Sequence, residues 1–310
     1  MVTASTNFAR LGSPLLRPQH PHLSLHHLCS SAVQQRRQRP MDQFHDRHHV
    51  WLRSLVHGTY LHADEDGHGV SLSSGRATMN AAWVVHLYGD DKHVLLHSAA
   101  YGRYLVATDA SAPQGCCGFR VEQRNYDEEL EEEAIKWQPH TNAAGDGILL
   151  RHAAAGSRYL RANGRHLRVS VDDFPSTMMR WVVVPIPSTE LVPCLPRPNR
   201  FLLHLAESLS ALLPTRMVEF IGNGNRFYAN PALFDFRGRS VFRLMKEVAR
   251  RMGIRRGVPD DLVMYVRAGE FGRFTPLVIN LPRSSQTLVI TVGPPAPDNV
   301  EPRYPDVGAE

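Results

Sequence analysis

Three stretches of the sequence share one pattern: VWLRSLVHGTYLHA (50–63), VLLHSAAYGRYLVA (94–107) and ILLRHAAAGSRYLRA (148–162). Each runs from an aliphatic-x-Leu group through a basic residue or His to Gly and then Tyr-Leu-x-Ala. A tryptophan that opens a strand-like run follows each tyrosine by 23, 33 and 22 residues. The shared residues are Gly58, Gly102, Gly156, Tyr60, Tyr104, Tyr159, Trp83, Trp137 and Trp181. Self-similarity at this period indicates three copies of one structural unit.

Each copy has short runs that alternate apolar and polar residues, separated by Gly, Asp and Asn, which is typical of strands and hairpins. A unit of this length has room for about four strands, and a propeller needs at least about four blades. Three four-stranded units instead suit a closed barrel with a hairpin cap, because closure removes unpaired sheet edges. The repeats therefore predict an all-β β-trefoil.

The repeated aromatic residues are expected in the core of this barrel. Adjacent residues on a strand point to opposite faces, so one residue of Tyr-Leu can line the barrel while the other packs under the cap. Tryptophan buries a large apolar area and can donate a hydrogen bond from its indole nitrogen. The rival interpretation is an exposed aromatic platform for a ligand. The predicted core residues are Tyr60, Tyr104, Tyr159, Trp83, Trp137 and Trp181.

Composition excludes several classes of protein. The 310 residues are 43% hydrophobic and contain no apolar run of the length that a membrane span needs. The net charge of +5 comes from five arginines in residues 1–40, which leaves 41–310 in balance with 30 basic and 30 acidic residues. A balanced folded region argues against a nucleic-acid partner. The four cysteines are too scattered for a disulfide scaffold or a zinc site, and they fit a reducing compartment.

The stretch MDQFHDRHHVWLRSLVHGTYLHADEDG (41–67) resembles the opening of plant proteins that carry domain of unknown function 569. YGRYLVATD (101–109) and RYLRANG (158–164) are similar to later segments of the same family. The resemblance covers roughly 41–187 and implies a fascin-like, actin-cross-linking type of β-trefoil. It implies actin as a partner without assigning actin-contacting residues. The matching positions are Met41, Phe44, Leu52, Arg53, Ser54, Tyr60, Leu61, Ala63, Asp64, Glu65 and Asp66.

A second pattern begins near Thr215. Strand-like runs at 217–221, 233–236, 261–267, 276–282 and 287–292 surround a helix expected over 240–253, with Ser240 as its N-cap and Gly253 at its end. One helix held by a mixed sheet predicts a smaller α+β domain of the ubiquitin-like (β-grasp) type. Many members of the family carry a comparable C-terminal module. The chain runs on past the last strand without Gly-Gly, which favours a protein-contact module over conjugation.

These patterns divide the chain into five parts. Residues 1–40 form a basic tail that is disordered, a transit peptide or an extension before a natural start at Met41; 41–187 form the β-trefoil; 188–214 form a proline-rich linker with a short helix at 201–213; 215–293 form the ubiquitin-like domain; and 294–310 form a disordered tail. The helix is expected to dock on one of the domains, since its apolar face lacks the Lys and Arg of a membrane-surface helix. The acidic run at 127–133 is expected to be a solvated hairpin insertion, or else a contact for a basic partner.

A ligand site is expected in the loops that follow each Tyr-Leu-x-Ala, because loops on a rigid scaffold carry function. Asp and Asn side chains there could hold sugar hydroxyls, or equally cap their own turns. The residues in question are Asp64, Glu65, Asp66, Thr108, Asp109 and Asn163. The Gln-x-Trp pattern of ricin-type lectins is missing, since Ala81, Ile135 and Met179 stand two residues before the tryptophans.

No catalytic, metal or cofactor motif is recognisable. GNGNRF (222–227) lacks the Gly-Lys-Ser/Thr ending of a phosphate loop, and the spacing of His45, His48 and His49 is not a metal-ligand pattern. The sequence therefore predicts a non-enzymatic cytoplasmic protein without cofactor or metal, with no nucleic-acid or integral membrane contact. It is expected to act through a protein partner, with actin as the implied candidate. The alternative is carbohydrate binding by the trefoil loops.

Overall fold

The computed structural model describes residues 39–89, 92–127, 129–142, 145–154, 157–198, 214–222, 231–254, 262–293 and 303–309. The predicted tail before residue 39, the helix expected at 201–213, most of the GNGNRF turn and the repeated Gly156 lie outside these residues. Within the described ranges, no helix is long and apolar enough to cross a membrane.

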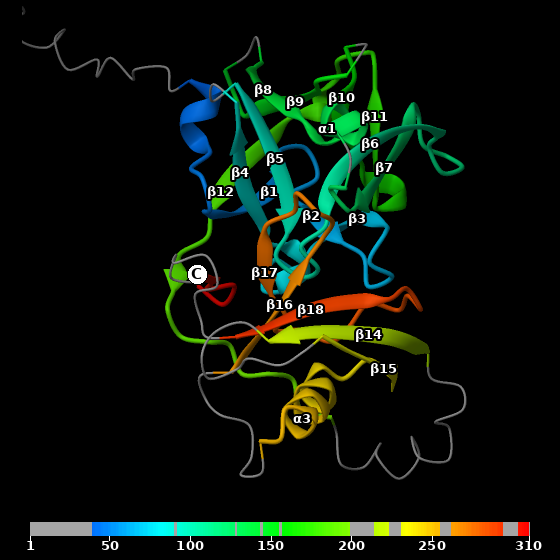
Figure 1. Ribbon diagram of the computed structural model, residues 1–310. Helices are drawn as coiled ribbons and strands as arrows, with labels where there is room; N and C mark the ends of the chain where they lie inside the picture. The colour runs from blue at the N-terminus through cyan, green and yellow to red at the C-terminus, as the bar shows by residue number, and fades with distance from the viewer. Residues whose placement is uncertain are drawn as a thin grey trace, which may run out of the picture. The chain divides into compact units, whose positions relative to one another are not determined.

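Each sequence repeat supplies four strands (Figure 1). The first has β1 (His49–Ser54), β2 (Tyr60–Ala63), β3 (Val70–Ser73) and β4 (Trp83–Tyr88); the second has β5 (His93–Ser98), β6 (Tyr104–Ser111), β7 (Phe119–Arg124) and β8 (Trp137–Thr141); the third has β9 (Ile148–His152), β10 (Tyr159–Asn163), β11 (Arg168–Asp172) and β12 (Trp181–Pro185). Short 3-10 helices are η2 (Pro40–Gln43), η3 (Met79–Ala81), η4 (Gly164–His166) and η5 (Thr177–Met179).

The first and last strand of every repeat close into a barrel. Antiparallel pairing runs around the ring from β1 to β4, β5, β8, β9 and β12, and β12 pairs with β1 again. The remaining strands form the hairpins β2–β3, β6–β7 and β10–β11. These meet one another through β3, β7 and β11 and cap one end of the barrel. The predicted β-trefoil is thereby confirmed.

The repeated glycine makes the turn from barrel strand to hairpin strand. Gly58 and Gly102 have φ values of +67° and +70°, which side chains disfavour. Their backbone N–H groups donate to the carbonyls of Ser54 and Ser98, at 2.9 and 2.8 Å. The turn sets the register in which the repeated tyrosine pairs back onto the preceding barrel strand, as the pair Arg53 and Tyr60 shows.

The three repeated tryptophans occupy equivalent places and are fully buried. Each begins the last strand of its repeat, and each indole nitrogen donates to the carbonyl of the leucine in Tyr-Leu-x-Ala. The pairs are Trp83 with Leu61 at 3.1 Å, Trp137 with Leu105 at 3.0 Å and Trp181 with Leu160 at 2.9 Å. The tryptophans and these leucines belong to one apolar cluster inside the barrel. The rival interpretation of these tryptophans as an exposed platform for a ligand is wrong, because their rings are fully buried.

The repeated tyrosines do not share one environment. The leucine of each Tyr-Leu pair points into the barrel, so the tyrosine lies on the outer side of its strand. Tyr104 is fully buried because Tyr126 and Ile135 pack over it, together with the ubiquitin-like domain. Tyr60, which packs beside Trp51, and Tyr159 are only partly buried. Their assignment to the core is corrected to a half-buried outer layer.

The acidic run forms a helix rather than the expected hairpin insertion. Its described part is α1 (Glu129–Ile135), which lies between β7 and β8. Lys136 Nζ lies 2.5 Å from Glu132 and 2.9 Å from Glu133, at the spacings that stabilise helices. Ile135 is fully buried and anchors the helix end to the barrel. Glutamate and leucine are good helix formers. The acidic composition of this run therefore indicated exposure to solvent but did not argue against a helix.

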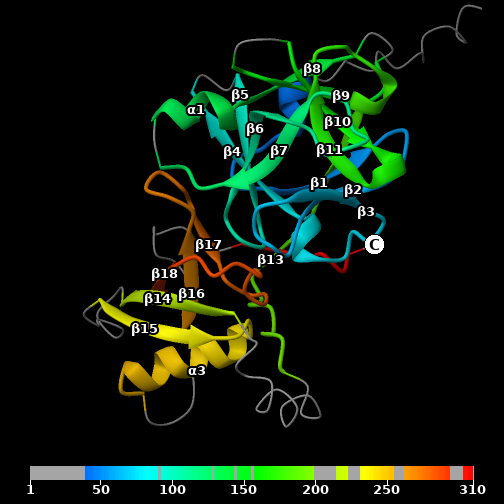
Figure 2. The same cartoon turned by 90° about the vertical axis from the view of Figure 1, so that its right-hand side faces the viewer.

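The second domain is a mixed sheet that holds one helix, which confirms the ubiquitin-like fold. The strands β14 (Thr215–Gly222), β15 (Ala232–Arg237), β16 (Val263–Arg267), β17 (Phe274–Pro276) and β18 (Leu288–Gly293) lie in the order β15-β14-β18-β16-β17. Only the central β14–β18 pair is parallel. The helix α3 (Val241–Arg251) packs its apolar side against the sheet face away from the trefoil (Figure 2). Ser240 is its N-cap, as predicted, and accepts from the Arg243 backbone N–H.

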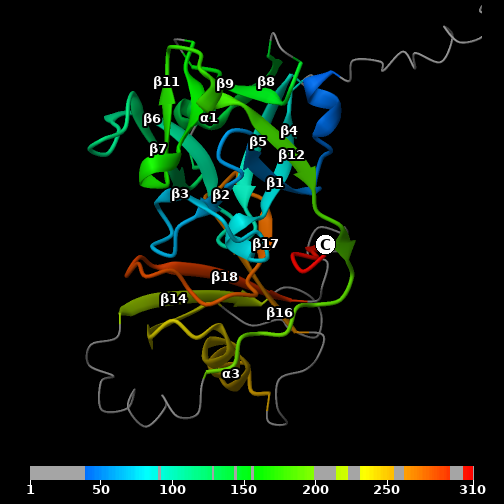
Figure 3. The ribbon, with the colours of Figure 1, turned by 180° about the vertical axis from the view of Figure 1, so that it is seen from behind.

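Two segments differ from the sequence prediction. The strand expected over 276–282 is found instead as β17 (Phe274–Pro276), which overlaps that range only at Pro276. The strand does not continue because Leu277 and Leu281 both pack in the domain core. The tail expected to be disordered over 294–310 contains β19 (Tyr304–Pro305), which pairs with β13 (Ser188–Thr189) inside the predicted linker. Figure 3 shows this C-terminal segment (red) beside the chain that leaves β12. Tyr304 is 1% exposed, and burial of its ring offsets the entropic cost of ordering the segment.

The two domains share a buried polar contact around Tyr104. The backbone N–H of Arg273 donates to the Tyr104 hydroxyl at 3.1 Å, and the Arg273 guanidinium lies 2.9 Å from Asp46. Burial raises the pKa of Tyr104 to about 12 and lowers that of His86, 3.1 Å from the same hydroxyl, to about 4. The hydroxyl and the imidazole are therefore neutral over the ordinary pH range.

Replacing a repeated tryptophan tests the threefold interaction. Trp137→Phe removes the indole donor, leaves the Leu105 carbonyl without that partner and opens space in the barrel. We expect the free energy of unfolding to fall by about 2 kcal/mol, measured by urea denaturation. Trp83→Phe and Trp181→Phe should cost similar amounts. An unfolding free energy unchanged from wild type in any of the three would contradict equivalent roles.

Buried histidines predict a loss of stability in acid. Burial lowers the pKa of His49 in the folded chain to about 4, whereas the unfolded chain titrates near its usual 6.5. The unfolded state therefore binds the proton first, and the His49 contribution to the unfolding free energy falls by about 3 kcal/mol as the pH drops from 6.5 to 4. Urea denaturation across this range measures the slope. His49→Gln should flatten it, and an identical slope in this variant would exclude His49 as its source.

Candidate functional site

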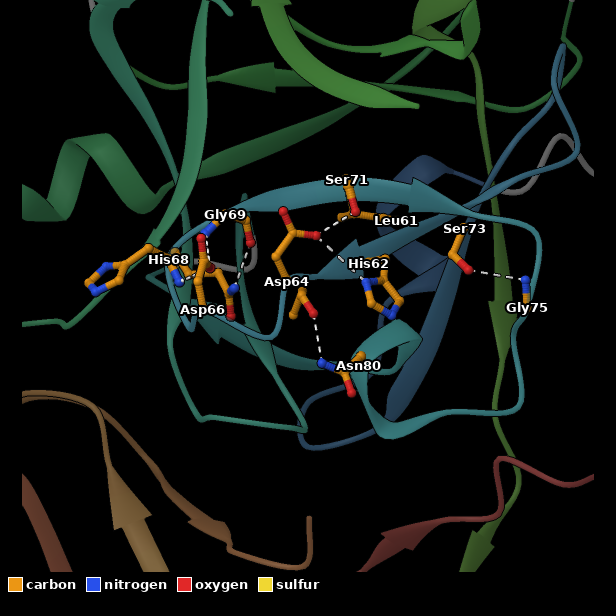
Figure 4. A network of polar contacts seen from close by, with 12 residues as sticks. Leu61, His62, Asp64, Asp66, His68, Gly69, Ser71, Ser73, Gly75 and Asn80 are labelled. Carbon is orange, nitrogen blue, oxygen red and sulfur yellow. Dashed lines mark hydrogen bonds and ion pairs between the residues drawn. The ribbon is translucent and has the colours of Figure 1, made fainter. Parts of the chain in front are cut away.

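Three of the side chains expected to bind a ligand after Tyr-Leu-x-Ala, one in each repeat, are bonded within their own hairpins. Figure 4 shows the first case, in which Asp64 turns toward Ser71 and His62. The equivalent residues of the other repeats bond across their hairpins in the same way. The bonds run from Ser71 Oγ to Asp64 Oδ1 at 2.5 Å, from Thr108 Oγ1 to the Arg120 carbonyl at 3.2 Å and from Asn163 Nδ2 to Ser170 Oγ at 2.9 Å. These three residues stabilise turns.

Glu65 contacts the ubiquitin-like domain. Its carboxylate lies 3.1 Å from the Arg239 guanidinium and 3.0 Å from that of Arg283, and its carbonyl accepts from the Arg283 backbone N–H at 2.7 Å. A loop predicted to hold a ligand therefore holds the second domain of the same chain.

Asp66 and Asp109 have different roles. Asp66 Oδ1 accepts from the backbone N–H groups of His68 and Gly69, at 2.8 and 2.7 Å, and so closes the β2–β3 turn (Figure 4). Asp109 is exposed, and the Arg158 guanidinium 2.7 Å away holds its pKa below the ordinary value. Of the predicted loop residues, Asp66 lines a cavity on the trefoil.

That cavity is a hollow of about 230 Å³ on the trefoil cap, where β3, β7 and β11 meet. We call it the cap hollow. Its floor consists of one valine from each repeat, and each valine pairs across its hairpin with the alanine of Tyr-Leu-x-Ala. The valines are Val70, Val121 and Val169, paired with Ala63, Ala107 and Ala162. The cap hollow therefore lies where the three repeats converge.

The residues before these valines form part of the rim and are not alike. Repeats two and three carry Arg120 and Arg168, both exposed, whereas repeat one carries Gly69. A Cβ at Gly69 would lie 2.4 Å from Asp64 Oδ2, so a side chain does not fit there. Neither arginine forms an ion pair within the described ranges. Repeats two and three therefore add a positive charge to the rim, and repeat one adds no side chain at the equivalent place.

The other charged groups that line the cap hollow are already engaged. Glu122 is paired with Arg124 at 2.5 Å, and Asp66 is bonded to backbone N–H groups. Burial, helped by the positive charge of Arg103, lowers the pKa of His68. Arg103 itself donates to the Gly67 carbonyl at 2.8 Å. Two guanidinium groups remain as the charges available to a ligand.

The sequence prediction missed Arg120 and Arg168. The signal was present, because both precede a valine that follows Tyr-Leu-x-Ala, but the repeats were aligned only as far as the alanine. The longer loop at 108–118 shifts the second hairpin strand of repeat two relative to the others. Elsewhere in the described chain, no group of three His, Cys, Asp or Glu side chains converges as a metal site requires.

Several solved structures are similar to just under half of this chain. A ricin B-like lectin from Macrolepiota procera in complex with lactose has 16% identity and a TM-score of 0.38, and the match covers 45% of this chain and 96% of the lectin. An SDF2-like protein from Arabidopsis thaliana has 14% identity and a TM-score of 0.39, with 46% and 94% covered. A Caenorhabditis elegans protein of unknown function has 18% identity and a TM-score of 0.38, with 46% and 97% covered. No curated protein matches the chain.

Two family descriptions match, one for each domain. Residues 41–183 match the β-trefoil domain of unknown function (DUF569), and residues 214–293 match the DUF569-associated ubiquitin-like domain. Both folds agree with the strand pairing described above. The chain therefore carries a DUF569 β-trefoil domain followed by the DUF569-associated ubiquitin-like domain.

Proposed function

We propose that this chain is a non-enzymatic binding protein that contacts a protein partner through the open sheet face of its ubiquitin-like domain. The observation that carries the proposal is a group of large apolar side chains on three adjacent strands, each 36 to 57% exposed. They are Met217 and Ile221 on β14, Leu233 on β15 and Val289 on β18, and we call them the sheet patch. Clustered exposed apolar side chains mark interaction surfaces in soluble domains.

The strand register makes the sheet patch continuous. Glu219 on β14 pairs with Leu233 on one side and with Val289 on the other, which places all three in one row across the sheet. Ile221 pairs with Thr291, and Thr291 pairs with Tyr265 at the far end of the next row. Tyr265 is 2% exposed. One end of this face is therefore buried, while the sheet patch stays open.

Charge on the face defines the kind of partner. Glu219 lies at the centre of the sheet patch, and Asp235 lies beside Met217. In the described part of the chain neither carboxylate forms an ion pair. A partner with aliphatic side chains next to Lys or Arg matches this surface, since interface cores are apolar and their rims are polar.

Carbohydrate recognition by the trefoil loops has less support. Asp64, Thr108 and Asn163 bond within their hairpins, so a neutral sugar would have to compete with those bonds. Actin, which the sequence resemblance implies, is one candidate protein partner for the sheet patch.

A photo-crosslinking experiment tests the sheet patch. The full chain carries p-benzoylphenylalanine in place of Leu233, and a matched control carries it in place of Phe174, which is 79% exposed on the trefoil. We expect a protein cross-link from position 233 and not from 174. Ile221→Lys should abolish this cross-link, because the lysine would place a positive charge on the sheet patch that repels a basic partner. The proposal fails if position 233 gives no protein cross-link, or gives the same products as 174.

Co-sedimentation with filamentous actin tests the cytoskeletal version separately. Wild-type chain should pellet with filaments at micromolar concentration, and Ile221→Lys should pellet less. A chain that stays in the supernatant excludes actin and leaves the cross-linked species as the partner to identify.

A further inference from the structure

We propose that the cap hollow binds a phosphate or sulfate group of a small molecule through Arg120 and Arg168. The two arginines come from different repeats and line the same hollow, at positions related by the internal repeat. Both are exposed, and within the described residues neither has an ion-pair partner. The site is on the trefoil and is independent of the sheet patch.

Among the described residues, the guanidinium groups of Arg120 and Arg168 make no hydrogen bond or ion pair that would stabilise the fold. Two other trefoil arginines are paired with carboxylates: Arg161 of β10 with Asp172 at 2.6 Å, and Arg158, just before β10, with Asp109 at 2.7 Å. Arg120 contributes its backbone to the hairpin, through the carbonyl that accepts from Thr108, but its guanidinium has no such bond. Two unpaired guanidinium groups at one hollow repel each other, and an anion between them would relieve that repulsion.

The chemistry of the guanidinium group selects the ligand class. Arginine stays charged at all ordinary pH values and offers a planar fork of N–H donors. Phosphate and sulfate present several acceptor oxygens that such forks bind in pairs. The carboxylates at the hollow are not paired with Arg120 or Arg168, because Glu122 is held by Arg124 and Asp66 accepts from two backbone N–H groups.

The size and floor of the cap hollow fit one such group. About 230 Å³ lies below the range of roughly 300–1,000 Å³ that drug-sized ligands fill, so the hollow suits a single oxyanion with a small carrier. The valine floor is apolar, which lowers the local dielectric and strengthens the interaction with the arginines.

Isothermal titration calorimetry with three probes tests this site in the full chain. Glucose 6-phosphate and glucose 6-sulfate supply the two oxyanions on the same carrier, and glucose is the uncharged reference. At constant ionic strength we expect saturable binding of at least one charged probe and none of glucose. The preferred probe identifies the natural group as phosphate or sulfate. Binding of glucose as tight as that of the charged probes, or no saturable binding of any probe, would overturn the proposal.

Three substitutions test whether the charged probe binds at the cap hollow. Arg120→Gln and Arg168→Gln should each weaken the charged probe by about tenfold or more, because each removes a charge-assisted hydrogen-bond donor. Arg243→Gln makes the same charge change on the exposed side of α3 and should leave the affinity unchanged. Thermal melting without ligand checks that both hollow variants stay folded, as expected for exposed side chains. Equal weakening in all three variants, or full affinity in both hollow variants, would place the anion elsewhere.

Discussion

The hydrogen bond from a buried tryptophan to the leucine carbonyl of the same repeat is the interaction on which the trefoil depends. It joins the last barrel strand of each repeat to the first hairpin strand, across 22, 32 and 21 residues of chain. The same indole rings fill the barrel, so one side chain both closes the repeat and supplies its core. A buried carbonyl without this donor would carry a desolvation cost, which explains why a smaller aromatic residue is a poor substitute.

The second domain uses surfaces that the barrel leaves open. Glu65 in the first repeat binds Arg239 and Arg283, while Tyr104 in the second repeat accepts from the backbone of Arg273. The third repeat contributes no comparable bond to the ubiquitin-like domain among the described residues. Equivalent positions in the three repeats therefore differ in function, because the ubiquitin-like domain contacts the first and second repeats in different ways.

The sequence predicted the features that the three repeats share and missed features that occur in only one part of the chain. Three copies of Tyr-Leu-x-Ala, each followed by a tryptophan, predicted the hairpins and the barrel core, since closure of the barrel places equivalent residues of the repeats in equivalent positions. The acidic run before Lys136 was assigned the wrong structure because charge reports exposure and not backbone conformation. The partners of Glu65 lie more than 170 residues away, and no local pattern distinguishes a glutamate that pairs from one that stays solvated. Arg120 was hidden by the longer loop before it.

Symmetry also explains where a binding site can arise in this fold. The interior positions of the three repeats must stay similar, because a change in one would disturb the ring of strands that all share. On the cap this constraint relaxes: Gly69 stands where the other repeats carry Arg120 and Arg168, and Asp64 fills the space beside it. Three arginines there would repel one another, and three glycines would leave a neutral dimple. The unequal set leaves two arginines on the rim of one hollow, which is the arrangement that a single anionic group can bridge.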